Sequence, residues 1–219
     1  MVSLSVLIPE SAFPSAGLTA ESNPWYSRAM LTVTLAILLS QSSDLLTPLL
    51  NRGPLALVEQ AKDGKFQAAT AIVLVNAAPE RVYETLLDHG KFKEYVPKVL
   101  TSEVEKSNAK SFEVRFVIDV PGPDTDYTIK YVRDDAKRTL KGTWAKGDLK
   151  DSKWEWRVEP GPEGKTLLFH ELKVKNFSSV LTSLEDERQT MTVGVNVSSA
   201  IAATTAVKNF IEGGAAAAK

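Results

Sequence analysis

The stretch LTSLEDERQTMTVGVNVSSAIAATTAVKNFI, residues 181–211, decides the fold. After Arg188 it runs to Val207 without a charged residue or a proline, and most of its side chains are small. Gly213-Gly214 follows, as at the end of a helix. We predict one long helix. At its beginning the sequence is compatible with either a helix or a strand, because apolar residues alternate there: Met191, Val193, Val195 and Val197.

This predicted helix needs apolar support from another part of the chain. Valine, threonine and glycine are weak helix formers, so packing rather than propensity must stabilise it. Helical spacing gives it one continuous face, made of Val193, Val197, Ala200, Ile201, Thr204, Val207 and Ile211. The rest of the sequence must supply the surface on which this face lies.

Composition excludes several classes of function. The chain has 219 residues, enough for one domain with a sizeable core and an appendage. Lysine plus arginine is 26 against 27 acidic residues, which argues against a nucleic-acid partner. No cysteine and two histidines are present, so we expect no metal site and no cofactor. No nucleophile motif or glycine-rich phosphate loop occurs, which makes hydrolysis a poor explanation.

The first 53 residues are predicted to form an N-terminal extension, followed by a domain at 54–213 and a disordered tail at 214–219. Residues 1–28 are rich in serine and proline and are expected to be disordered. The apolar run at 29–39 is too short to span a bilayer. Two interpretations stay open: an export signal, giving an exported, periplasmic or membrane-associated protein, and a helix packed on a cytoplasmic domain.

The beginning of the domain predicts a hairpin and two short helices. Asp63-Gly64 lies between two apolar runs and is the strongest short hairpin signal. Pro79 then follows Asn76-Ala77-Ala78 and precedes Glu80, a typical start of a helix, which His89-Gly90 ends. Residues 91–95 are expected to form a second short helix that stops before Pro97.

From Val99 to Asn176 the apolar pattern has a period of two, with short turn-forming connections between the runs. This predicts consecutive antiparallel strands, hence a sheet of six or seven strands whose one face is apolar and aromatic and whose other face, with Arg115 and Glu171, is charged. The apolar face needs a cover, and the long C-terminal helix is the available one.

The segments AIVLVNAAPERVYETLLD (71–88) and FKEYVPKV (92–99) resemble those of the START-like (SRPBCC) superfamily. Within it the chain is most similar to the polyketide cyclase/dehydrase and coenzyme Q-binding branch. The resemblance covers about residues 55–213. It implies an α+β helix-grip fold, in which a curved antiparallel sheet wraps around the C-terminal helix and one hydrophobic ligand lies between them.

The resemblance leaves two functions open: binding or transport of a lipid, quinone or polyketide-like molecule, and a cyclase or aromatase acting in the same cavity. We expect a hydrophobic small molecule as partner and transient membrane contact. His170 is a candidate catalytic residue, or else a satisfied core residue, whereas His89 is expected to be an exposed residue at a helix end. The candidate ligand-binding residues are Phe116, Tyr127, Tyr131, Trp144, Trp154, Trp156, His170, Val197, Ile201 and Thr204.

Overall fold

The computed structural model describes residues 43–120, 122–174 and 188–213. The predicted apolar run at 29–39, the disordered segments at 1–28 and 214–219, and the predicted helix start at 181–187 lie outside these residues. The described residues all belong to one compact unit.

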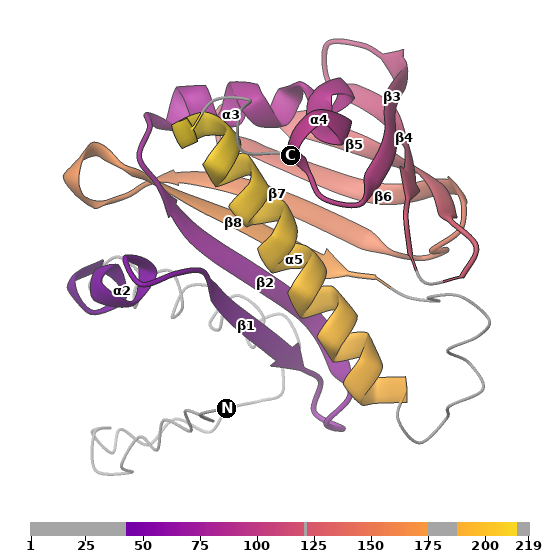
Figure 1. Cartoon of the computed structure of the whole chain (residues 1–219), viewed down its shortest axis with the longest axis horizontal. Helices are drawn as coiled ribbons and strands as arrows, with labels where there is room; N and C mark the ends of the chain where they lie inside the picture. The colour runs from indigo at the N-terminus through magenta and orange to yellow at the C-terminus, as the bar shows by residue number, and fades with distance from the viewer. Residues whose placement is uncertain (1–42, 121, 175–187, 214–219) are drawn as a thin grey trace, which may run out of the picture. The chain divides into compact units, whose positions relative to one another are not determined.

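Within the described residues, eight strands form one antiparallel sheet in the order β1-β2-β8-β7-β6-β5-β4-β3 (Figure 1). The predicted helix-grip arrangement is confirmed, because the sheet curves around a single long C-terminal helix. The strands are β1 (Leu55–Gln60), β2 (Phe66–Val75), β3 (Val99–Ser107), β4 (Ser111–Ile118), β5 (Thr125–Asp134), β6 (Thr139–Gly147), β7 (Lys153–Pro160) and β8 (Thr166–Lys173).

The strand count is higher than the predicted six or seven. β3 lies at one edge of the sheet, and most of its side chains are exposed. The period-two pattern was predicted to begin at Val99, but in β3 only Ser102 is fully buried. The hairpin predicted at Asp63-Gly64 is confirmed, since β1 and β2 pair around it.

The short helices lie where the sequence predicted them. α3 (Pro79–Leu87) is followed by a 3₁₀ turn, η2 (His89–Lys91), and by α4 (Phe92–Tyr95). A further helix, α2 (Ser43–Leu50), contacts β2, although it precedes the predicted domain boundary at residues 53 and 54. Another 3₁₀ turn, η3 (Pro162–Gly164), leads into β8.

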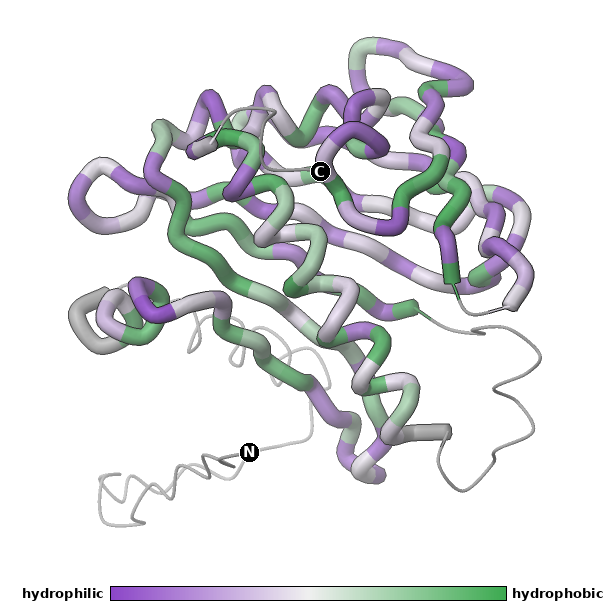
Figure 2. Tube along the Cα trace, viewed as in Figure 1, coloured by the Kyte–Doolittle hydropathy of each residue, from purple (hydrophilic) through white to green (hydrophobic). Residues whose placement is uncertain are grey.

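α5 (Arg188–Gly213) is helical over its whole described length, including the early turns that the sequence left open. It crosses the sheet along β2 and β8 (Figure 1). By length and composition its segment Thr190–Gly213 could cross a membrane. Its contacts with β2 and β8 instead make it the cover of the apolar sheet face. Figure 2 shows that β2, along which α5 lies, is apolar over most of its length.

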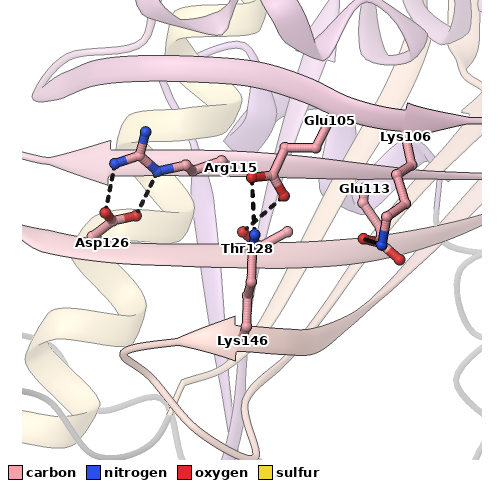
Figure 3. A network of polar contacts seen from close by, with 7 residues as sticks. All are labelled: Glu105, Lys106, Glu113, Arg115, Asp126, Thr128 and Lys146. Atoms are coloured by element: carbon pink, nitrogen blue, oxygen red, sulfur yellow. Dashed lines mark hydrogen bonds and ion pairs between the residues drawn. The ribbon is translucent and has the colours of Figure 1, made fainter.

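The outer face of β3 to β6 is charged, and its charges pair across strands (Figure 3). Arg115 binds Asp126 at 2.7 Å, and Glu105 accepts a hydrogen bond from Lys146 at 3.0 Å. Lys106 and Glu113 form a third pair at 2.9 Å. Exposed ion pairs contribute little stability, about 0–1 kcal/mol each. These charged side chains make the outer face of the sheet polar, and the core lies on the opposite face.

Candidate functional site

The inner sheet face brings most of the predicted aromatic residues together. Because side chains alternate along a strand, residues paired across strands share a face. The register pairs Phe116 with Tyr127, and Trp156 with His170. Gly142 lies between Tyr131 and Trp154, and a Cβ atom there would approach Ile129 and Tyr131 to 2.8 Å. Glycine is therefore required at this position to let the large rings on both sides meet.

His170 stacks on Trp156, with ring centroids 3.5 Å apart and an angle of 7° between the rings. Its Nδ1 lies 3.2 Å from the carbonyl oxygen of Glu155, to which it is placed to donate. Burial lowers the pKa of His170 to about 3, while the Glu155 carbonyl acts in the opposite direction. His170 is thus a neutral, partnered core residue at neutral pH and a weak base.

A second stack joins Tyr127 and Trp154, whose rings are parallel within 4° at 5.7 Å. The Phe116 ring lies 5.8 Å from that of Tyr127. Burial raises the pKa of the Tyr127 hydroxyl, so it stays protonated. Trp144 differs from this group, because it is only half-buried and its Nε1 donates to the carbonyl oxygens of Gly147 and Asp148. Trp144 therefore anchors the turn between β6 and β7.

His89 lies inside the core, and the prediction of an exposed residue at a helix end was wrong. The η2 turn directs its ring inward, and its side chain is fully buried. The ring stacks on Phe92 at 4.3 Å and lies 4.4 Å from Tyr131. Burial lowers the pKa of His89 to about 3, and repulsion from a charged His170 contributes less. The Leu86 carbonyl acts in the opposite direction, but it forms no hydrogen bond with either ring nitrogen.

Four buried polar atoms on three side chains around the Phe92 ring have no hydrogen-bond partner among the described residues: both ring nitrogens of His89, the hydroxyl of Tyr95 and the Nε1 of Trp156. The rings of His89, Tyr95 and Trp156 lie 4.3, 5.5 and 6.2 Å from that of Phe92. An unpaired buried donor or acceptor costs about 1–3 kcal/mol, so native proteins keep few of them. Their concentration at one place is typical of a site that supplies polar contacts to a bound molecule.

Tyr131 completes this polar set. Its side chain is buried, and burial raises the pKa of its hydroxyl, with a smaller contribution from Tyr127. The Trp156 indole N–H opposes the rise without reaching hydrogen-bonding geometry. Burial likewise raises the pKa of Tyr95. Both phenols are therefore neutral hydrogen-bond donors, and neither is a base near neutral pH.

On the helix side, α5 buries Ala200, Thr204 and Val207 of its predicted face completely, and the other predicted residues of that face are half-buried. Its fully buried polar residues are Asn196 and Thr204. Thr204 donates to the Ala200 carbonyl of its own helix at 2.9 Å, while the predicted Val197 and Ile201 are half-buried. Sequence analysis missed Asn196, although its spacing of four from Ala200 placed it on the buried stripe.

Asn196 ties the helix to the end of the sheet. Its Oδ1 accepts from the Val174 N–H at 2.8 Å, and its Nδ2 donates to the Val174 and Thr192 carbonyls at 3.2 and 2.8 Å. At the other end of α5, the Phe210 ring stacks on Tyr95 of α4 at 4.2 Å. The helix is thus held over the aromatic interior at both ends.

Solved structures with the same fold include an aromatase/cyclase and two lipid transfer proteins. The Zhui aromatase/cyclase from Streptomyces sp. R1128 has a TM-score of 0.55 and 19% identity, with 67% of this chain and 93% of that chain covered. The STAR-related lipid transfer protein from Xanthomonas axonopodis has a TM-score of 0.55 and 15% identity, with 73% and 93% covered. The human StarD13 lipid transfer and protein localization domain has a TM-score of 0.51 and 17% identity, with 80% and 97% covered.

At such identities these structures establish the fold alone. No curated protein matches the sequence. The family described as polyketide cyclase / dehydrase and lipid transport matches residues 67–216, which include the sheet from β2 onward, α3, α4 and α5. The match spans more than half of the sequence, and the chain therefore belongs to the polyketide cyclase / dehydrase and lipid transport family.

Proposed function

We propose that the interior between the sheet and α5 binds one hydrophobic small molecule, of the lipid, quinone or polyketide-like class, within a domain that extends over residues 54–213. The observation that carries the proposal is the set of unpaired buried polar groups on His89, Tyr95 and Trp156. They lie among aromatic rings, which suits a ligand with an apolar body and one or two polar atoms. A ligand carbonyl or hydroxyl would accept from these donors.

Binding is favoured over catalysis by the state of the titratable groups. The pKa values of His89 and His170 are lowered to about 3, and burial raises those of Tyr95 and Tyr131. None of these groups exchanges a proton readily near neutral pH, as a general acid or base must. A cyclase in the same interior would have to act by shaping its substrate, and it would reveal itself by turnover of a polyketide-like substrate.

Native mass spectrometry on protein gently extracted from its host tests the proposal first. We expect a stoichiometric hydrophobic molecule to remain bound. Titration with decyl-ubiquinone and with a fluorescent phospholipid then compares two ligand classes, because Trp154 and Trp156 in the interior report binding by fluorescence quenching. An interior that binds neither probe and carries no molecule from the host would overturn the proposal.

Replacing His89 tests whether its side chain contacts the ligand or only packs in the core. His89→Leu removes two unpaired buried nitrogens at similar volume but loses ring stacking, so we expect the ligand-free protein to be more stable by about 1 kcal/mol. Ligand affinity should fall about tenfold or more, because the ligand then faces an apolar side chain. Urea unfolding and probe titration measure the two effects.

His89→Gln is the matched control, since it keeps one donor and one acceptor and should retain more affinity than His89→Leu. A purely structural His89 predicts the opposite pattern: His89→Leu would bind the probes like the wild-type protein.

A bulky residue on α5 tests where the ligand lies. Ala203 is partly buried against the core, whereas a Cβ atom at Gly194 meets nothing within 4 Å. We expect Ala203→Trp to abolish probe binding and to cost about 1–3 kcal/mol of stability by overpacking. Gly194→Trp, on the same helix, should bind normally. Equal binding by both variants would show that the ligand does not lie under this part of α5.

A further inference from the structure

The end of β2 extends beyond its neighbour in the sheet, and α5 covers the gap. β1 begins at Leu55, opposite Ile72, so the last residues of β2 have no strand on that side. The Lys208 ammonium donates to the Leu74 carbonyl oxygen at 2.6 Å, and the Glu212 carboxylate accepts from the Asn76 N–H at 2.6 Å. The two side chains pair with each other at 2.8 Å. An ion pair thus takes the place of a missing strand.

A pocket of about 250 Å³ opens beside this ion pair. Its walls come from the last residue of α2 and the link to β1 (residues 50–54), from the end of β2 and from the last turns of α5. Leu50, Pro54 and Val73 supply apolar surface. A volume of this size holds roughly a dozen non-hydrogen atoms, the size of a small phosphate ester.

The polar lining of the pocket is mostly cationic. Among the described residues, Arg52, Lys165 and Lys208 line it, against the single acid Glu212. Lys165 also pairs with Glu163, outside the pocket, whereas no described acid forms an ion pair with the exposed Arg52. Thr205 also lines the pocket, and its buried hydroxyl has no hydrogen-bond partner among the described residues. Arginine, lysine and hydroxyl donors together suit an oxyanion.

We propose that this pocket is a second binding site, separate from the aromatic interior, for a small oxyanion group such as a phosphate monoester. Arg52 and Lys165 supply charge and donors, Thr205 supplies a hydroxyl, and Leu50 and Pro54 contact the apolar part that carries the anion. Free phosphate esters and the headgroups of anionic lipids share this chemistry. The site does not depend on a ligand in the interior.

Isothermal titration at low salt with inorganic phosphate and with glycerol 3-phosphate tests the site. We expect glycerol 3-phosphate to bind more tightly than phosphate, because its carbon chain meets the apolar wall. Arg52→Gln should weaken binding about fivefold, the usual scale for a partly exposed charged hydrogen bond. Lys137→Gln, in the turn between β5 and β6 and outside the pocket lining, is the matched control and should change nothing.

Glu212→Gln is expected to strengthen anion binding, whereas Arg52→Gln weakens it. Glutamine keeps an acceptor for the Asn76 N–H and for Lys208 but removes the only acid among the described lining residues, so the anion should bind several-fold more tightly. Co-sedimentation with phosphatidylcholine vesicles, with and without phosphatidic acid, distinguishes a lipid headgroup from a free ester. The proposal is overturned if no probe binds, or if Arg52→Gln and Glu212→Gln shift affinity in the same direction. Retained binding of decyl-ubiquinone in these variants would keep the interior site separate.

Discussion

Lowering the pH from 7 to 5 is expected to reduce the free energy of unfolding by about 4 kcal/mol, through His89 and His170 together. Both rings are buried, and burial lowers both pKa values from 6.5 to about 3. At pH 5 the unfolded chain therefore binds a proton at each histidine that the folded chain does not bind. Stability is fully present above pH 6.5 and is lost as the pH falls toward 3.

The size of this effect follows from the unfolded state. At pH 5 both folded-state rings are still neutral, so each histidine contributes about 2 kcal/mol from the protonation of the unfolded chain alone. Carboxylates with lowered pKa values, such as Asp126 and Asp135, are ionised in this range in both states. Burial raises the pKa of Glu171, which works in the opposite direction.

Urea unfolding of the wild-type protein and of the double variant His89→Leu, His170→Leu at pH 7, 6 and 5 measures the effect. Because Glu171 is present in both proteins, the difference between their pH profiles isolates the histidines. The wild-type profile should fall steeply toward pH 5, and the profile of the variant should be nearly flat. Parallel profiles would mean that the histidines titrate alike in the folded and unfolded states.

Much of the fold could be predicted because it depends on periodic patterns. A period of two places Tyr131, Trp154, Trp156 and His170 on one sheet face, and the register confirms that they lie together. The Asp63-Gly64 turn and Pro79 mark a hairpin and a helix start, which the structure also contains. These signals are local, so no knowledge of tertiary contacts is needed to interpret them.

The polar part of the candidate site could not be predicted in the same way. His89 lies in a three-residue turn between two helices, where no periodicity indicates the direction of the side chain. Asn196 is buried because it hydrogen-bonds to Val174, just after the end of β8. A pattern of apolar residues does not indicate such a polar contact between distant parts of the sequence. Trp144 lies next to an irregularity in the pairing of β5 with β6, and its indole turns to backbone carbonyls. Tertiary contacts decide all three positions.

Asn196→Leu is expected to cost about 2–5 kcal/mol of stability. The leucine side chain fills a similar space but leaves the Val174 N–H and carbonyl without their partner, and both residues are buried. Each unsatisfied backbone group costs about 1–3 kcal/mol. Asn209→Leu, the same substitution at an exposed position of α5, should change stability by about 0.5 kcal/mol or less.

Urea unfolding gives the stability difference, and hydrogen exchange of the Val174 amide locates its origin. The Asn196→Leu variant should exchange this amide much faster, because the asparagine oxygen is its hydrogen-bond acceptor among the described residues. If exchange and stability match those of the Asn209→Leu control, the contact does not hold α5 to the sheet. If both change as expected, the buried amide and not the small apolar residues around it fixes the helix over the aromatic interior, which leaves those small residues free to accommodate a ligand.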